Sequence, residues 1–279
     1  MKKEQLKEIT EKLENGVKEL LNSDKYKEYL AFLSKFHNYS FNNTFLILLQ
    51  YPTASLVAGF ETWKNKHKRY VKKGEKGIKI IAPAPVKVKT KDENNEEIDK
   101  DILLYKAVTV FDISQTEGAE LPLMQTQELT ASVENYKDFY TKLENISPCP
   151  IIFEKIENGV KGYYSEKENK IAINEGMSEL QTLKALIHEI SHATLHNSEA
   201  AKKRDKKPSR NAKETEAESI AFTVLSYLGL DTSEYSFIYL ASWGGEDLKE
   251  LKESLEIIRD TAAKLINAIS SGDTIKKAA

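Results

Sequence analysis

The sequence predicts an α+β protein of two domains. Apolar residues recur at helical spacing in the first forty residues and again from residue 178 onward, whereas the segments between them are rich in β-branched residues. A stretch with no periodic apolar face follows residue 113 and contains Gly118 and Pro122. We therefore expect a first domain over residues 1–115, a linker over 116–130 and a second domain over 131–279.

The composition indicates a globular protein of the cytoplasm. Of its 279 residues, 40% are hydrophobic and 30% are charged. The longest apolar run, residues 45–49, is far shorter than the roughly 20 residues that span a bilayer, and the charged start lacks the apolar core of a signal peptide. Cys149 is the single cysteine, which excludes an intrachain disulfide and a thiolate metal cluster. We expect a cytoplasmic protein with no membrane partner.

The first domain begins with helices and continues with strands. Apolar residues at helical spacing predict helices over residues 6–21 and 26–36, and NNTFLILLQYP predicts a third helix that begins at an asparagine cap and stops at Pro52. The β-branched runs IKIIAP, VKVKT and ILLYKAVTVFDI predict strands. Between the last two, KDENNEEIDKD has the composition of a long hairpin tip.

The second domain begins with a helix over about residues 131–145. Three short strands are expected at PIIFEKI, VKGYYS and KIAIN, and the capping-box spacing of Ser178 and Gln181 then predicts the start of a long helix. A basic loop, AKKRDKKPSRNAK, precedes a helix over ETEAESIAFTVLSYLG that stops at Gly229. A last amphipathic helix is expected over about residues 246–270.

The long helix that follows Ser178 contains three of the five histidines, in LIHEISHATLH. His188 and His192 are four residues apart, so their rings share one helix face with room for a metal ion between them. H-E-x-x-H is the signature of metallopeptidases: neutral imidazoles suit Zn²⁺, and the glutamate, here Glu189, accepts the proton of a water activated by the metal. We expect Zn²⁺ as the cofactor.

A zinc site of this type needs a third protein ligand. His196 lies about 12 Å along the helix axis from His188, too far to share an ion, and is expected at the surface or beside a ligand histidine. The next helix offers Glu214 and Glu218 on one face, with Glu216 pointing elsewhere. One glutamate of the pair would bind the metal and the other would hydrogen-bond a ligand histidine. Alternatively, these acids only complement the helix dipole.

The run from KIAINEGMSELQTLKALIHEISHATLH to ETEAESIAF resembles the ImmA/IrrE type of zinc metallopeptidase domain. The resemblance implies a zincin-like fold for the second domain, Glu214 as the third metal ligand and Glu218 as a neighbour that supports the ligands. Tyr235 and Tyr239 follow the ligand helix and are candidate donors to a polarised carbonyl, although core packing is the alternative for at least one of them.

The segment YSFNNTFLILLQYPTASLVAGFETWKNKHKRYVKKGEKGIKIIAPAP, closed by FDISQTEG, resembles the single-stranded-DNA-binding domain of ArdC-like antirestriction proteins. The resemblance covers most of residues 20–118 and includes G-F-x-x-W and R-Y-V-x-K-G-E-K-G. Where the family commonly has a Gly-Arg pair, this sequence has Lys68 and Arg69. The resemblance implies that the first domain is an α+β domain that binds single-stranded DNA.

The charge distribution agrees with a nucleic-acid partner. The net charge is −2, yet residues 61–91 hold eleven lysine or arginine residues against two glutamates. Single strands are held by a basic groove and by aromatic faces on which bases stack. The expected DNA contacts are Trp63, Arg69, Tyr70, Lys72, Lys73, Lys76 and Lys79. The alternative is that the cations are only solvated and the aromatic rings belong to the core.

These features together predict a mobile-element antirestriction protein that binds single-stranded DNA and carries a zinc-dependent peptidase site. A protein or peptide substrate and a restriction enzyme are further expected partners. Two alternatives remain open: a DNA-coating protein with a structural or vestigial metal site, or a regulatory metallopeptidase that cleaves a repressor or partner protein.

Overall fold

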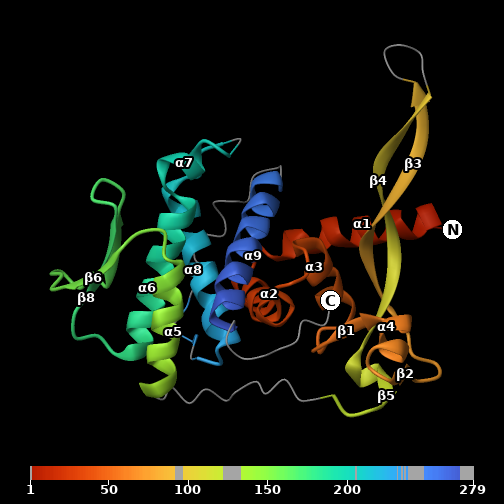
Figure 1. Cartoon of the computed structure of the whole chain (residues 1–279), viewed down its shortest axis with the longest axis horizontal. Helices are drawn as coiled ribbons and strands as arrows, with labels where there is room; N and C mark the ends of the chain where they lie inside the picture. Colours follow the sequence, from red (N-terminus) through yellow and green to blue (C-terminus); the bar gives the residue numbers. More distant parts are fainter. Residues whose placement is uncertain are drawn as a thin grey trace. The chain divides into compact units, whose positions relative to one another are not determined.

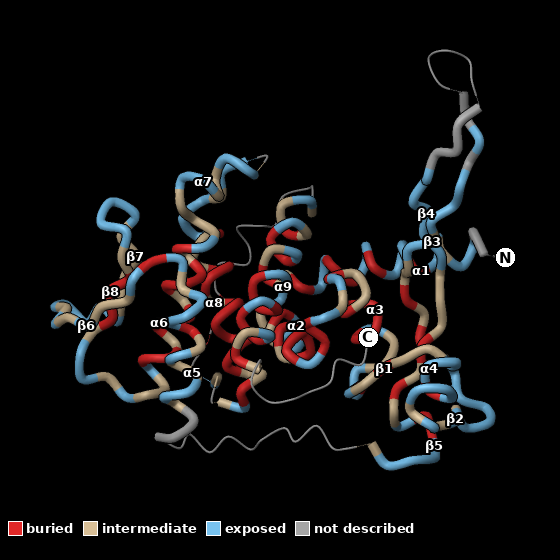
Figure 2. Tube along the Cα trace, viewed as in Figure 1, coloured by how far each residue is buried: buried red, intermediate tan, exposed pale blue. Residues whose placement is uncertain are grey.

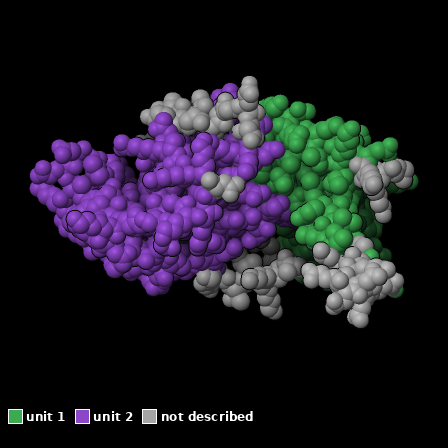
Figure 3. Space-filling view, turned by 90° about the horizontal axis from the view of Figure 1, so that it is seen from above, with its two compact units in different colours: residues 1–18, 41–123 green, residues 19–40, 124–279 purple. Residues whose placement is uncertain are grey.

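The computed structural model describes residues 2–91, 97–121, 133–204, 206–230, 232–233, 235, 237 and 248–270. It confirms the α+β fold with two domains. The chain forms two compact units, coloured separately in Figure 3. The first comprises residues 1–18 and 41–123, and the second comprises residues 19–40 and 124–279. Residues 19–40, which we expected in the N-terminal domain, thus pack with the C-terminal part of the chain.

The first unit combines three helices with a hairpin and two short strand pairings (Figure 1). The helices are α1 (Lys2–Glu19), α3 (Phe41–Gln50) and α4 (Phe60–Asn65), with a 3-10 turn over Ile113–Gln115. The strands are β1 (Val57–Gly59), β2 (Arg69–Val71), β3 (Ile78–Lys91), β4 (Glu97–Asp112) and β5 (Thr116–Gly118). In one antiparallel sheet β4 lies between β1 and β3, and β2 pairs with β5.

The runs IKIIAP and VKVKT form one continuous strand, β3, where the sequence suggested two. Pro83 pairs with Tyr105 of β4, and Pro85 pairs with Leu103. Proline has no N–H to donate, so it fits a strand only where that donor would face away from the neighbouring strand. Both prolines are compatible with β3 because it is an edge strand, with none of the described strands on its outer side.

The outer side of β3 is bonded to two side-chain amides of α3. Asn43 donates to the carbonyl of Ile81 at 2.8 Å and accepts from its N–H at 2.9 Å. Gln50 makes the same pair of bonds with Lys79, at 2.8 and 2.9 Å. An amide offers both a donor and an acceptor, so each side chain takes the place of a residue in a neighbouring strand. These bonds fix α3 against β3.

The segment FDISQT builds a structural turn. Asp112 is 1% exposed, and its carboxylate accepts hydrogen bonds from the backbone N–H groups of Ser55, Leu56 and Ser114. Gln115 completes a capping box by accepting from the N–H of Asp112. Because these backbone donors would otherwise be unsatisfied, one carboxylate closes the loop before β1 and the turn after β4.

The second unit packs helices around α8 and places a three-stranded sheet against α6. Its helices are α2 (Ser23–Phe36), α5 (Val133–Ile146), α6 (Glu179–Leu195), α7 (Ser198–Ala201), α8 (Arg210–Tyr227) and α9 (Lys249–Ser270). Its strands are β6 (Ile151–Glu154), β7 (Gly162–Ser165) and β8 (Lys170–Asn174). The sheet order is β6-β8-β7, with β6 parallel and β7 antiparallel to β8.

Helix α8 is the centre of this unit because it contacts α2, α6 and α9. Most of its residues from Thr215 to Leu225 are buried, as the tube in Figure 2 shows. It begins at Arg210, inside the predicted basic loop, since Ser209 caps it by accepting from the N–H of Ala212. None of the described helices combines the length and apolar character needed to span a bilayer.

Candidate metal centre

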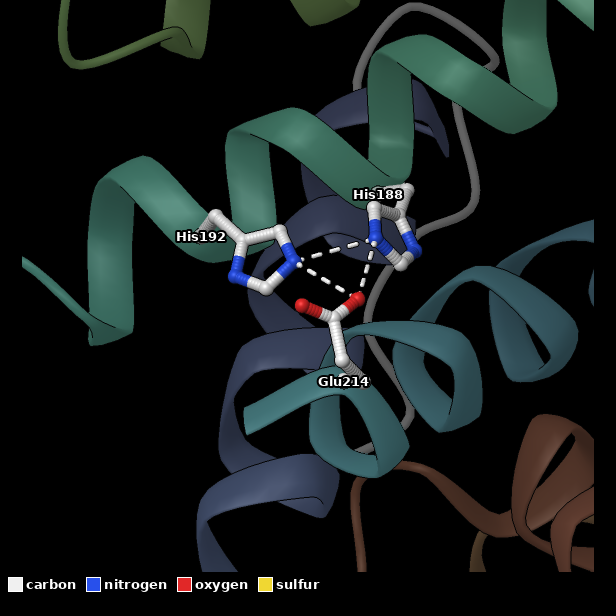
Figure 4. Close-up of side chains that lie close together, drawn as sticks. All are labelled: His188, His192 and Glu214. Atoms are coloured by element: carbon white, nitrogen blue, oxygen red, sulfur yellow. Dashed lines mark hydrogen bonds and ion pairs between the residues drawn. The ribbon is translucent and has the colours of Figure 1, made fainter. Parts of the chain in front are cut away.

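Helix α6 presents two histidine rings to one point. Ser178 caps its N-terminus, as predicted, and the helix continues without interruption through His188 and His192. The Nε2 atoms of the two histidines are 3.0 Å apart (Figure 4). Both residues are partly buried, and the apolar face of the helix that includes Leu186, Ile187 and Ile190 packs into the core. The helix therefore fixes two nitrogen atoms as a pair of metal ligands.

Glu214, in the second turn of α8, supplies the third ligand atom. Its Oε2 lies 3.5 Å from Nε2 of His188 and 3.6 Å from Nε2 of His192. Metal–ligand bonds of about 2.0–2.2 Å at tetrahedral angles place ligand atoms about 3.3–3.5 Å apart. The triangle of two nitrogens and one oxygen therefore fits a divalent ion such as Zn²⁺, and these three residues form a candidate metal site. The Glu214 side chain is 45% exposed, which leaves one side of the triangle open to solvent.

Glu189 lies beside this triangle and is held by β7. It is 8% exposed, and its carboxylate accepts a hydrogen bond from the N–H of Tyr164. A Cβ atom at Gly162 would lie 2.9 Å from the carbonyl oxygen of Ala172 and 3.3 Å from Cγ of Glu189. Glycine thus allows β7 to approach the glutamate closely. Gly162 and Tyr164 were not among the predicted site residues, because their position depends on the packing of β7 against α6.

The carboxylates make the centre attractive to a cation. Burial alone would lower the pKa of His188, but Glu214, Glu189 and Glu218 outweigh it and raise that pKa. The neighbouring imidazoles of His188 and His192 hold the pKa of Glu214 well below its usual range. Burial raises the pKa of Glu189, against the opposing effect of the two histidines. A divalent cation would be stabilised by the same negative charges.

Glu218 and Tyr235 lie close enough to influence each other. Burial, and then the charge of Glu218, raise the pKa of Tyr235 far above its usual range. Oε2 of Glu218 and the hydroxyl of Tyr235 are buried and have no hydrogen-bond partner among the described residues. The ring of Tyr235 packs edge-on against Phe222, and Nζ of Lys184 lies 3.8 Å from its centroid. Neither residue is hydrogen-bonded to the metal triangle in the described part of the chain, and Tyr239 lies outside the described residues.

A third histidine of α6 lies behind His192. The side chain of His196 is 4% exposed and its Nδ1 lies 2.8 Å from Nδ1 of His192, so of the two expected positions it takes the one beside a ligand histidine. Its Nε2 lies 2.9 Å from Oε2 of Glu216. Glu216 does point away from Glu214, as predicted, but it is fully buried and accepts two hydrogen bonds from Arg204 and one from Ser254. The helical spacing gave its direction, but its partners come from the end of α6, from the connection before α8 and from α9.

The predicted DNA contacts in the first unit divide into residues that are buried or bonded within the unit and residues that remain exposed. Trp63 is fully buried and donates its indole N–H to the carbonyl of Phe111, so it offers no face to a base and that prediction is wrong. Arg69 donates to Thr116 and to the carbonyl of Ala119, which ties β2 to the chain around β5.

The predicted lysines also differ in whether they form hydrogen bonds within the unit. Lys72 donates to the carbonyl of Ser114 and Lys79 donates to the hydroxyl of Thr109. Lys73 and Lys76 are exposed, and Tyr70 is 54% exposed. Of the seven predicted residues, these three therefore keep their functional groups most available to a ligand.

Comparison with known proteins matches two regions of the chain to two different family models. Residues 1–111 match the family model of the N-terminal domain of anti-restriction factor ArdC. Residues 147–266 match the model of the IrrE N-terminal-like domain, a peptidase family. An uncharacterized protein of Bacillus anthracis is 29% identical over 310 residues, which cover 96% of this chain and 51% of that protein. The chain spans about half the length of this curated relative.

Two solved structures share the fold. The antirestriction ArdC protein from the R388 plasmid, in a metal-free structure, is 21% identical with a TM-score of 0.55 over 84% of both chains. Its Mn(II)-bound structure is 18% identical with a TM-score of 0.53 over 86% of both chains. At these identities the likeness shows a common fold and leaves the chemistry to be argued from the residues of this chain.

Proposed function

Because the chain joins an ArdC-type N-terminal domain to an IrrE N-terminal-like domain, we propose that it is a mobile-element antirestriction protein that binds single-stranded DNA and hydrolyses peptide bonds. The observation that carries the proposal is the triangle of His188, His192 and Glu214 with the buried carboxylate of Glu189 beside it. A purely structural zinc site has no use for such a carboxylate. We place this activity in the cytoplasm.

His188, His192 and Glu214 would hold Zn²⁺, with one coordination position left for water or substrate. Such an ion polarises a carbonyl group and lowers the pKa of water. The solved ArdC protein from the R388 plasmid binds Mn(II), so manganese is the competitor to measure against zinc. Elemental analysis of purified protein, after growth with each metal, identifies the bound ion.

Glu189 is the general base of the proposed reaction. Its carboxylate accepts a proton from the attacking water as the water oxygen bonds to the peptide carbonyl carbon. The same oxygen of Glu189 then donates that proton to the departing amine nitrogen as the carbon–nitrogen bond breaks. The N–H of Tyr164 holds the carboxylate in place during both transfers. The leaving amine thus departs neutral, and the glutamate returns to its starting charge.

Tyr235 is the candidate donor to the substrate carbonyl oxygen, since its buried hydroxyl makes no hydrogen bond in the described part of the chain. Tyr235→Phe would keep the ring packing and remove the donor alone. A decrease in kcat with unchanged metal content supports this role, whereas unchanged kcat assigns Tyr235 to the core.

In the first unit, Tyr70 would stack on a base while Lys73 and Lys76 contact phosphates. All three are exposed and belong to the basic segment that we predicted to bind DNA. Stacking and phosphate contacts are the two interactions by which single strands are held without sequence preference. Single-stranded DNA is therefore the proposed ligand, and a restriction enzyme or another DNA-bound protein is the proposed substrate class.

Glu189→Gln tests the proposal because glutamine keeps the shape of the side chain but cannot accept the proton. We expect metal content and DNA binding to stay unchanged while peptide hydrolysis and the protection of incoming DNA from restriction are lost. Glu175→Gln removes an exposed carboxylate after β8 and is the matched control. Full protection by Glu189→Gln would instead support a protein that protects DNA by coating it, with a metal site that serves only the fold.

A further inference from the structure

A chain of hydrogen bonds runs from the metal triangle into the core of the second unit. It starts at Nδ1 of His192, on the opposite side of the ring from the Nε2 that faces Glu214. It continues through both nitrogens of His196 and ends at the buried carboxylate of Glu216. Every distance in it is 2.8 or 2.9 Å, within the range of a good hydrogen bond.

At the Glu216 end of this series of hydrogen bonds, the direction of donation is fixed. Glu216 accepts from both terminal nitrogens of Arg204, at 3.0 and 2.8 Å, and from the hydroxyl of Ser254 at 2.7 Å. Burial alone would raise the pKa of Glu216, but His196 and Arg204 hold it below its usual range. The carboxylate is therefore an acceptor, and Nε2 of His196 must carry a proton to donate to it.

The proton on Nε2 of His196 determines the state of the next ring. A neutral imidazole has one N–H and one lone pair, so Nδ1 of a neutral His196 can only accept. The bond of 2.8 Å between the two Nδ1 atoms then requires that His192 carries its proton on Nδ1. Nε2 of His192 is left with its lone pair pointing at the metal triangle, which is the form that binds a metal ion.

We propose that Glu216, acting through His196, sets the tautomer of His192 for metal binding before any metal arrives. His196, Glu216 and Arg204 are positioning residues in this arrangement, because none of them offers a ligand atom to the metal and they act through His192. Metal-bound histidines usually have a carboxylate or carbonyl partner on the second nitrogen. Here His196 lies between the ligand His192 and the carboxylate of Glu216, so this carboxylate is one imidazole ring farther from the metal. The inference rests on the metal site of the proposed function.

The first test measures the tautomer in the metal-free protein. Long-range correlation of the ring protons and nitrogens of His192 by NMR, in wild-type full-length protein at mildly alkaline pH, distinguishes a proton on Nδ1 from one on Nε2. We expect the proton on Nδ1 in wild type and a mixture of tautomers in Glu216→Gln. A metal-free wild type with the proton on Nε2 would overturn the proposal, whatever the protein does to peptides.

The second test measures zinc affinity by competition with a chelator. His196→Leu removes the acceptor for His192 but keeps the pair of Arg204 and Glu216, and loss of an outer partner of this kind typically weakens metal binding about 10- to 100-fold. His196→Asn restores an acceptor near the position of Nδ1 and should recover part of the loss. Thr194→Ala, which removes a hydroxyl bonded within the same helix, is the control that should bind zinc like wild type.

The outcomes distinguish the positioning role of His196 and Glu216 from the proposed peptidase activity. Unchanged zinc affinity in His196→Leu, with circular dichroism showing an intact fold, contradicts the positioning role. If His196→Leu does not fold, the wild-type tautomer alone decides. A wild type that binds no metal contradicts the proposed peptidase, but the tautomer of its His192 still tests the hydrogen-bond chain.

Discussion

The metal centre of the second unit and the basic segment of the first, residues 61–91, were both expected from sequence, but their side chains are used differently in the structure. At the metal centre, spacing indicated His188 and His192 and left Glu214 and Glu218 open, and the ligand atoms of His188, His192 and Glu214 lie within 4.8 Å of one another. In the basic segment, Arg69, Lys72 and Lys79 donate hydrogen bonds to groups of their own unit.

The difference arises from what each pattern constrains. Four residues of α-helix fix the angle between two side chains, so H-E-x-x-H specifies a geometry as well as a composition. A run of cations specifies only a local charge, and a long flexible side chain can turn back to an internal carbonyl. A charge run therefore identifies a region, and hydrogen bonds then decide which of its members face a ligand.

The largest effect is expected where geometry is fixed. Glu214→Ala removes the carboxylate that faces both histidines, so metal content measured by elemental analysis should fall from about one ion per chain to nearly none. Glu218→Ala removes a carboxylate of the same helix whose Oε2 has no hydrogen-bond partner among the described residues, and it should retain the ion. Equal losses in both variants would show that the triangle alone does not define the site.

Trp63 tests the distinction between core and contact in the first unit. Truncation of a fully buried tryptophan to alanine should lower the free energy of unfolding by about 3–5 kcal/mol, measured by denaturant titration. Tyr70→Ala should change stability by less than about 0.5 kcal/mol, because its ring is mostly exposed.

For DNA binding the order should be reversed, with the larger effect from Tyr70→Ala and the smaller from Trp63→Ala. We expect Tyr70→Ala to weaken binding of a single-stranded oligonucleotide by about 1–3 kcal/mol, the contribution of one stacked base. The comparison fails if Tyr70→Ala binds like wild type, since an exposed ring without effect would leave the aromatic part of the interface unidentified.

A smaller effect is expected from the exposed lysines. Reversal of both charges in Lys73→Glu with Lys76→Glu should weaken binding and flatten the dependence of log K on log salt by about 1.4, since each phosphate contact on a single strand contributes about 0.7. Fluorescence anisotropy over a range of salt concentrations measures both. Lys155→Glu with Lys161→Glu makes the same charge change on exposed lysines of the second unit and should leave the slope unchanged.

The smallest effect concerns His37 of the second unit, a histidine that belongs to neither region. Its Nδ1–H donates to the carbonyl of Ser34, and its Nε2 accepts from Asn38, so a second proton would break the latter bond. Burial lowers the pKa of His37 from its usual 6.5. The unfolded chain therefore binds this proton more readily, and stability should fall as the pH drops below about 6.5.

His37→Gln, which cannot titrate, should show a weaker loss of stability over the same acid range when unfolding is followed with denaturant at several pH values. An identical pH profile for the variant and the wild type would contradict the assignment of this acid sensitivity to His37.

The elements that sequence could predict are those whose signals are local. The Ser178 cap, the apolar face of α6 and the spacing of His188 and His192 are all encoded within one helix. The bond from Trp63 to the carbonyl of Phe111 spans 48 positions, and that from Arg204 to Glu216 depends on how the connection before α8 folds back. Such contacts follow from tertiary packing, so an aromatic motif was mistaken for a binding surface and Glu216 was set aside.

The edge of β3 has a consequence for how the protein behaves among its own copies. From Lys79 to Pro85, the backbone groups that face outward are taken by Asn43 and Gln50 or lack the N–H altogether. Leu103 and Tyr105 on the neighbouring strand are each 56% exposed, a composition that favours intermolecular sheets and aggregation. Between Lys79 and Pro85 an approaching strand finds no free backbone donor, so this stretch of β3 does not template a fibril-like sheet.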